Sequence, residues 1–388
     1  MRLCTSLMAV VLLASAQPTL TADQSIVEEP RISTSATRIL ASGGGNAAYT
    51  SGFESLMVNP AAYAGNGEFT LLAAGVGLYA APERVLRAPA AVLSGETPPM
   101  LGSAARLYTD RIDREGIGFS GTAGLGFAGG GLGLGIVGDF DAHIRDRNGE
   151  YDGHFLAEAG LVGGLALAFE AGPFDLSIGA DIRPFVRIRS DLSDAEQVAR
   201  FLDGEPFLEA FAEAPSLNGF GLGLNTGVAM RYRGLTAGLA IRDLGGTQVV
   251  YREHPLGEVI TSAASGFLPP GGDNSGALYD PDSSYVLPAQ VRIGLAWAPD
   301  FGDAFEPALF GELVDIHRLG SSGIQGIDVF SAGAEVTLGR FLTFRSGVNA
   351  QGFGLGGGIS FGVVHVDGGL SFGRAEAPKA GLDASIRF

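Results

Sequence analysis

Cysteine, lysine and charge are all scarce in this chain of 388 residues. Cys4 is the only cysteine and Lys379 the only lysine, and charged residues make up 17% of the sequence. Because acidic residues outnumber basic ones by 42 to 25, the formal net charge is −17. A nucleic-acid partner, which needs a basic surface facing its phosphates, is therefore not expected.

Long apolar runs are also missing, except at the N-terminus. Arg2, the apolar run that follows it and the small residues at 14–16 form the pattern of a secretory signal peptide. We expect residues 1–16 to be removed, with cleavage after Ala22 as the alternative. The mature chain then lacks Cys4, which excludes disulfides, thiol catalysis and thiolate metal sites. Beyond the signal, no run of 18 or more apolar residues predicts a transmembrane helix.

Glycine and apolar residues, by contrast, are abundant. The chain has 61 glycines and 46% hydrophobic residues, and its mean hydropathy is +0.24. This composition is too apolar for a disordered chain and too poor in charge for an ordinary soluble protein. Two classes remain for an exported protein of this kind, a secreted β protein and a β-barrel of an outer membrane.

Apolar residues recur at every second position in many segments, as in 173–189, 218–232 and 287–297. The same alternation reaches the last residue of the chain, with Leu382, Ala384, Ile386 and Phe388 on one face. A transmembrane barrel strand meets lipid on one face and the lumen on the other, so this period is expected of it. A soluble β-sandwich also alternates, but its outer face is rich in lysine and glutamate. Here the second face is mainly glycine, alanine and a few charges, which favours the barrel.

The alternation predicts fourteen strands, an even number. The connections after even-numbered strands are brief, whereas those after odd-numbered strands include the long segments 80–115, 190–217 and 244–284. Bacterial outer-membrane barrels have short periplasmic turns and long extracellular loops. The predicted strands are 68–79, 116–127, 131–145, 154–169, 173–189, 218–232, 234–243, 285–298, 305–317, 327–338, 341–350, 353–363, 364–373 and 380–388.

Residues 17–67 precede the barrel domain 68–388 and do not alternate. They form either a periplasmic tail or a plug folded into the lumen. Glycines on the lumen face of the strands favour the plug, because they leave room for a main chain inside the barrel. Within the plug, Asn59, Pro60 and Ala61 are the expected anchor, since proline fixes the turn and the asparagine amide can pair with main-chain groups.

At residues 52–61, which read GFESLMVNPA, the sequence resembles the FadL family of outer-membrane transporters of long-chain fatty acids and other hydrophobic compounds. The segment 346–349, SGVN, and the terminal Phe388 are also similar to that family, and the resemblance in layout extends over 36–388. It implies a fourteen-stranded barrel with an N-terminal hatch. It also implies that outer loops capture hydrophobic ligands, which pass after the hatch moves.

An outer-loop insertion at about 190–214 switches to helical spacing. Ser193 and Glu196 fit a capping box, and two short amphipathic helices are expected after it. Their apolar residues, with two from the loop 244–284, are candidate ligand contacts: Val198, Phe201, Leu202, Phe207, Leu208, Phe211, Phe267 and Leu268. The alternative is that these side chains pack against one another and against the barrel rim.

Alternation directs several arginines into the lumen. One interpretation pairs them across the wall with inward aspartates, and the other lets an arginine hold a fatty carboxylate by two hydrogen bonds. Arg183 and Arg292 are the candidate ligand contacts. The full inward set is Arg183, Arg231, Arg242, Arg292, Arg345 and Arg387, with Asp139, Asp141, Asp175, Asp181 and Asp367.

Motifs of enzymes lack their structural context. The G-x-G-x-x-G matches at Gly124 and Gly133 do not open a helix, and the G-x-S-x-G match at 358–362 continues as a strand on both sides. The five histidines show no spacing suited to a metal. We therefore expect no enzymatic activity, no cofactor and no metal.

The sequence thus predicts an all-β protein, a fourteen-stranded antiparallel transmembrane barrel in the outer membrane of a diderm bacterium. Its expected function is passive, hatch-gated uptake of fatty acids or other hydrophobic molecules. Its expected partners are the hydrophobic ligand, membrane lipid and the outer-membrane assembly machinery, and it is expected to be a monomer. The alternative is a structural or adhesin barrel that docks other proteins through its long acidic loops.

Overall fold

The computed structural model describes residues 25–32, 37–79, 116–264, 278–280, 283–318, 329–350, 352–373 and 378–388. The predicted signal peptide 1–16, and Phe267 and Leu268, lie outside the described residues. The helices are α2 (Thr37–Ala41), α3 (Gly52–Val58), η1 (Pro60–Ala64), α6 (Ala195–Leu202), α7 (Phe207–Ala210), α8 (Leu256–Ala264) and η2 (Ile316–Arg318). The strands are β1 (Ser25–Glu28), β2 (Glu68–Tyr79), β3 (Ile117–Gly129), β4 (Leu132–Arg147), β5 (Glu150–Ala171), β6 (Phe174–Asp191), β7 (Pro215–Tyr232), β8 (Leu235–Arg242), β9 (Thr247–Pro255), β10 (Ser283–Leu287), β11 (Gln290–Trp297), β12 (Phe305–Val314), β13 (Phe330–Leu338), β14 (Leu342–Asn349), β15 (Gly352–Phe361), β16 (Val364–Gly373) and β17 (Lys379–Arg387).

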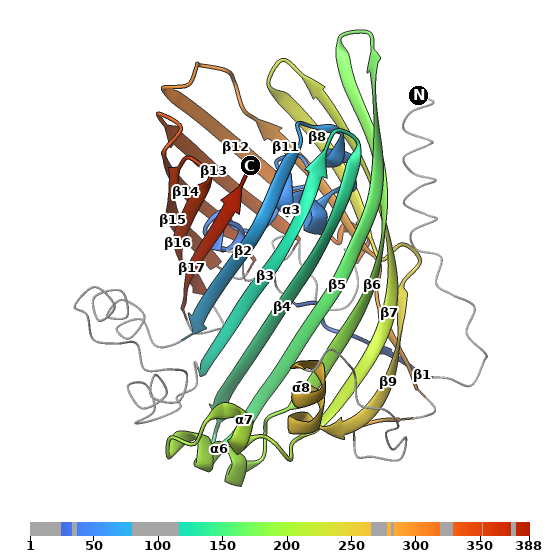
Figure 1. The fold of residues 1–388 in the computed structure, drawn as a ribbon, viewed down its shortest axis with the longest axis vertical. Coiled ribbons are helices and arrows are strands. Elements are labelled where there is room, and N and C mark those ends of the chain that lie inside the picture. Colours follow the sequence, from blue (N-terminus) through green and yellow to red (C-terminus); the bar gives the residue numbers. More distant parts are fainter. Residues whose placement is uncertain are drawn as a thin grey trace.

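The strands β2 to β17 form a closed antiparallel barrel with fourteen positions around it (Figure 1). Strands β8 and β9 share one position because both pair with β7. Strands β10 and β11 share the next position because they pair with β9 and β8, respectively. The last strand, β17, pairs with β2 and closes the ring. The predicted fourteen-stranded antiparallel barrel is confirmed.

One predicted strand is broken in the middle, and one observed strand lies in a segment that was predicted as a loop. The strand predicted at 234–243 ends at Arg242, and β9 resumes at Thr247 inside the segment that was predicted as loop 244–284. Asp243, Gly245 and Gly246 all have positive φ, so they cannot continue an extended strand. The strand predicted at 285–298 breaks between β10 and β11 at Pro288, which has no N–H for the ladder.

The outer face of the barrel is apolar where the strands cross the membrane. Leu165 and Leu167 of β5 have 66% and 74% of their surfaces exposed, and leucine, valine and isoleucine repeat this on other strands. Exposed aromatic side chains gather near the short turns, among them Phe169, Trp297, Phe341 and Phe361. An apolar band bordered by aromatic residues is the surface that a barrel presents to lipid.

No helix within the described part of the chain is both long enough and apolar enough to cross a membrane.

The wall of the barrel is uneven in height. Strands β4, β5, β6 and β7 have 16, 22, 18 and 18 residues, whereas β11 and β14 have eight each. Figure 1 shows this tall wall in green and yellow-green, with α6, α7 and α8 at the end of the barrel away from the C-terminus, which is marked C. That end carries the described loop insertion 192–214, and outer-membrane barrels have their longer loops on the extracellular side.

The seam between β17 and β2 depends on the last residue of the chain. The N–H of Phe388 donates to the carbonyl of Phe69 at 2.8 Å, and the N–H of Phe69 donates to the carbonyl of Phe388 at 3.1 Å. Deleting Phe388 removes both bonds and leaves a strand edge unpaired at the membrane boundary. We expect the fraction of folded protein, measured by heat-dependent migration in gels, to fall several-fold. Phe388→Ala keeps both main-chain bonds and is the control, and equal losses in the two variants would show that the aromatic ring matters instead.

Candidate functional site

Residues 37–67, which we call the lumen segment, lie inside the barrel. Helix α2 contacts strands β14 to β17, α3 contacts β2 to β4, and η1 contacts β3 to β7. Glycines of the wall make these contacts possible, because a Cβ at Gly179 or Gly238 would fall on main-chain atoms of Pro60 or Ala47. The wall therefore has glycine, which lacks a side chain, at positions where the lumen segment lies against it.

Asn59 holds the turn of the lumen segment before β2. Its side chain is fully buried, its Nδ2 donates to the carbonyl of Ala47 at 2.7 Å, and its Oδ1 accepts from the N–H of Ala61 at 3.0 Å. Asn59 is extended, and Pro60 begins η1 directly after it. Proline suits the first position of a helix because its missing N–H has no partner there.

The two candidate ligand arginines both contact the lumen segment. Arg183 of β6 is buried and donates to the carbonyl of Leu56. Arg292 of β11 donates to the carbonyl of Gly45 at 2.6 Å and pairs with Glu312 of β12 at 2.5 Å. Glu312 in turn accepts from the N–H of Ala47 at 2.7 Å. These charged groups thus form hydrogen bonds with main-chain atoms of the lumen segment, which are not paired in any strand.

The contacts of another arginine fit the interpretation in which inward arginines pair with acidic side chains of the wall. Arg345 of β14 pairs with Glu335 of the neighbouring strand β13 at 2.5 Å and with Asp367 of β16, one strand beyond the other neighbour β15. Tyr63 of η1 donates to Asp181 of β6 at 2.8 Å. Burial raises the pKa of the Tyr63 hydroxyl well above its ordinary value, and the Asp181 carboxylate raises it further. Tyr63 therefore remains a hydrogen-bond donor at any physiological pH.

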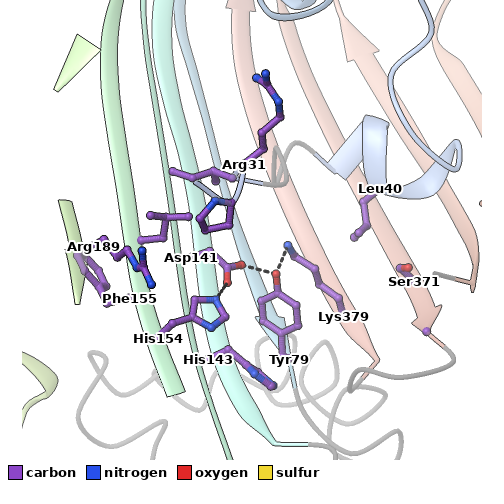
Figure 2. A pocket seen from close by; sticks show the side chains of 14 residues that line it. Arg31, Leu40, Tyr79, Asp141, His143, His154, Phe155, Arg189, Ser371 and Lys379 are labelled. Carbon is purple, nitrogen blue, oxygen red and sulfur yellow. Dashed lines mark hydrogen bonds and ion pairs between the residues drawn. The ribbon is translucent and has the colours of Figure 1, made fainter. Parts of the chain in front are cut away.

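A cavity of about 440 Å³ lies in the lumen on the loop side of α2 (Figure 2). Strands from both sides of the β17–β2 seam contribute to it, and the chain leading into the lumen segment forms another wall. Its lining residues are Pro30, Arg31, Ile32, Leu40, Tyr79, Asp141, His143, His154, Phe155, Leu156, Arg189, Ser371, Gly373 and Lys379.

One side of the cavity carries a chain of polar contacts between side chains of β17, β2, β4 and β5. The Nζ of Lys379 donates to the hydroxyl of Tyr79 at 2.7 Å, and that hydroxyl donates to Asp141. The other oxygen of Asp141 lies 3.1 Å from the Nε2 of His154. Figure 2 shows the four side chains in a row, with Leu40 and Arg31 on another side of the space. Lys379 is only 5% exposed, so the single lysine of the chain is held inside the barrel.

A second, smaller cavity of about 40 Å³ lies next to the first, and Arg31 and Ile32 border both. Four arginines and three carboxylates line it, so it is far more polar than the first cavity. The Nε atoms of Arg183 and Arg242 are buried there without a hydrogen-bond partner in the described structure. The charged lining is Arg31, Arg183, Arg187, Arg242, Asp139, Glu158 and Asp243.

The apolar residues of the predicted loop helices form a cluster of their own. Val198, Phe201, Phe207 and Phe211 are buried in it, Leu202 packs at its edge, and Leu208 is 49% exposed. The cluster continues onto the barrel through Ala142, Ile144, Phe155 and Ile188.

This cluster covers the outer face of the tall wall. Ala142 pairs with Phe155 directly beside the pair formed by His143 and His154, which line the lumen cavity. Neighbouring residues of a strand point to opposite faces, so Ala142 and Phe155 face outward. Helices α6, α7 and α8 therefore pack against the outside of β4 to β6, as the rim-packing alternative expects. Among the described residues, Phe155 alone borders both the cluster and the cavity. A role of the loop residues in ligand binding stays a prediction.

Sequence reasoning identified part of the cavity. Alternation places Asp141 on the lumen face, and Lys379 is the only lysine of the sequence. The pairing of Tyr79 with Lys379 was missed, because the two residues are 300 positions apart and meet only through the closing seam. The register that follows from joining the last strand to the first could have found it.

No protein-family model and no curated protein matches this chain. Among solved structures, the chain is similar to the toluene transporter TodX of Pseudomonas putida, with 13% identity, 94% of this chain and 99% of that chain covered, and a TM-score of 0.43. It is similar to a FadL homologue of Pseudomonas aeruginosa, with 14% identity, coverage of 94% and 98%, and a TM-score of 0.44. It is also similar to the toluene transporter TbuX of Ralstonia pickettii, with 12% identity, coverage of 90% and 96%, and a TM-score of 0.39.

Proposed function

We propose that this protein is an outer-membrane channel that takes up hydrophobic small molecules. The observation that carries the proposal is the cavity of about 440 Å³, which lies inside a membrane-spanning barrel and against the lumen segment. A lipopolysaccharide surface slows apolar solutes, and an apolar space within a barrel offers them a way past it. In this proposal the ligand enters from the loop side, and movement of the lumen segment lets it pass.

The lining suits a ligand with an apolar body and a carboxylate end. Ile32, Leu40 and Leu156 supply apolar surface, and Lys379 and Arg189 supply positive charge. Lysine has three donor hydrogens, so a carboxylate can exchange with its present partners or be added to them. A long-chain fatty acid has this chemistry.

Lys379→Met tests the carboxylate contact. A hydrogen bond to a charged group contributes roughly 1.5–3 kcal/mol, so affinity for a long-chain fatty acid should fall by about 10- to 100-fold. Affinity for the corresponding alcohol should fall much less, because it carries no charge. Both are measured by displacement of a fluorescent fatty acid from the purified protein in detergent.

Arg340→Met is the matched control, since Arg340 is an exposed cation at a turn outside the lumen. It should leave both affinities unchanged. Equal losses for acid and alcohol in Lys379→Met would mean that the lysine shapes the cavity and does not bind the head group. Absence of any displaceable fatty acid or hydrocarbon from the wild-type protein would contradict the proposed function itself.

A further inference from the structure

The second cavity lies where the chain that leads into the lumen segment meets the wall of the barrel. Arg31 comes from that chain, Met57 from α3, and Arg183 and Arg242 from β6 and β8. The volume of the cavity is about 40 Å³, whereas one water molecule in the liquid occupies about 30 Å³. The cavity therefore has room for a small ion or for water, and not for a long-chain ligand.

Two of the four arginines that line the cavity have a carboxylate partner of their own. Arg31 pairs with Asp243 at 2.5 Å, and its other terminal nitrogen donates to the carbonyl of Pro288. Arg187 pairs with Glu158 at 2.8 Å. The charges of these two guanidinium groups are therefore balanced locally.

Arg183 and Arg242 have no such partner. Neither of them forms an ion pair with a carboxylate in the described part of the chain. Arg183 is only 6% exposed and donates to the carbonyl of Leu56, but its Nε and the Nε of Arg242 are both buried without a protein acceptor. A buried N–H group without an acceptor is unfavourable, and a buried charge without a counter-ion is more so.

The nearby carboxylates do not supply the missing charge. Asp139 lines the cavity, but it lies directly opposite another carboxylate, Glu158. Asp181, two residues before Arg183, accepts from the amide of Asn225 at 2.6 Å, and it is Asn225 that lines the cavity. Two unpaired guanidinium groups thus face one unpaired carboxylate, so the lining carries an excess of positive charge.

We infer that the second cavity binds a small monovalent anion such as chloride, held by the Nε–H groups of Arg183 and Arg242. An anion accepts from both N–H groups and also cancels the excess charge, whereas water does only the first. Arg183 also holds the carbonyl of Leu56, and Arg31 joins the entering chain to Asp243 of the wall. The anion therefore stabilises the lumen segment in its place.

The test measures thermal unfolding of the purified protein in detergent, followed by heat-dependent migration. Chloride is replaced stepwise by gluconate, which is too large for the cavity, at constant ionic strength, so the screening of surface charges does not change. A ligand that binds only the folded state stabilises it in proportion to the logarithm of its concentration once the site is saturated. The Tm of the wild-type protein should therefore rise by several degrees as chloride replaces gluconate.

Arg242→Met should abolish this dependence on chloride. In gluconate alone its Tm should equal or exceed that of the wild type, because the substitution removes one unpaired buried charge. Arg231→Met is the matched control, since Arg231 is an exposed arginine of β7 that does not line the cavity. It should keep the full response to chloride.

Asp139→Asn distinguishes an anion from a bridging water. It removes a negative charge beside the anion, so the chloride concentration that gives half of the Tm rise should fall several-fold. A water molecule that bridges Asp139 to the arginines predicts no response to chloride in either protein. Bromide should replace chloride, and its anomalous scattering in crystals should place it between the two Nε atoms.

Three results would overturn the inference. A wild-type Tm that is the same in chloride and gluconate would assign the cavity to water. An equal loss of the response in Arg231→Met and Arg242→Met would place the anion elsewhere. Competition of chloride with a fatty acid, but not with the corresponding alcohol, would assign the two arginines to the carboxylate of the organic ligand. Because the Tm measurements use no such ligand, the inference and the proposed uptake function can fail independently of each other.

Discussion

Deleting residues 24–58 is expected to raise single-channel conductance in planar bilayers several-fold. The deletion removes β1, α2, α3 and the main chain held by Arg183 and Arg292, while every strand from β2 to β17 remains. The ring of main-chain hydrogen bonds stays closed, so the barrel itself should still assemble. The deletion removes β1 and most of the segment that fills the lumen, and η1 remains.

A deletion of similar kind outside the lumen provides the control. Removing residues 195–211 takes away α6 and α7, which pack on the outer face of the tall wall, and should leave conductance unchanged. If the deletion of 24–58 conducts like the wild-type protein, the lumen segment is not the barrier to flow. Hatch-gated uptake would then lose its main support.

Gly179→Val is expected to produce the second largest effect, frequent channel openings in a barrel that still folds. A Cβ at this position would fall on main-chain atoms of Pro60 and Ala61, and main chain has little freedom to yield. Overpacking of this kind costs about 1–3 kcal/mol, which favours displacement of η1 from the wall. Openings should become several-fold more frequent in bilayer recordings.

Gly368→Val is the matched control, because no atom lies within 4 Å of a Cβ there. Both variants place valine on a wall strand, but only one of them meets the lumen segment. Heat-dependent migration should be normal for both. Equal opening frequencies would mean that the fit between wall glycines and η1 does not keep the channel shut.

The fold could be predicted from the sequence because lipid and lumen impose opposite demands on alternate residues. That demand acts on each strand separately, so each strand shows the alternation in its own sequence. The short turns between strands show which strands are neighbours in the barrel. The break at Pro288 was missed because apolar residues continue at every second position across it, and β9 was missed because it lies within the predicted loop 244–284. Strand β1 was missed for another reason, since four residues that pair in parallel with a strand 258 positions away carry no hairpin signal.

The candidate site was harder to predict, because it depends on contacts between distant parts of the chain. Helical spacing showed which faces of α6 and α7 are apolar, but it cannot show whether they cover the mouth or the outside of the wall. Inward arginines were found by alternation, but Arg183 and Arg292 also donate to carbonyl groups of the lumen segment, which no side-chain pattern identifies. Tyr79 and Lys379 become neighbours only when the first and last strands join.

The closing seam also has a consequence for the order of assembly. The lumen segment is synthesised before β2 to β17, and β17, which closes the ring against β2, is synthesised last. Because α2 touches β14 to β17 while η1 touches β3 to β7, the segment spans the ring from one flank of the seam to the far wall. If the sheet forms around this segment, contacts with the segment fix the radius of the barrel. The segment that fills the finished channel is thus also placed to guide the assembly of the barrel strands.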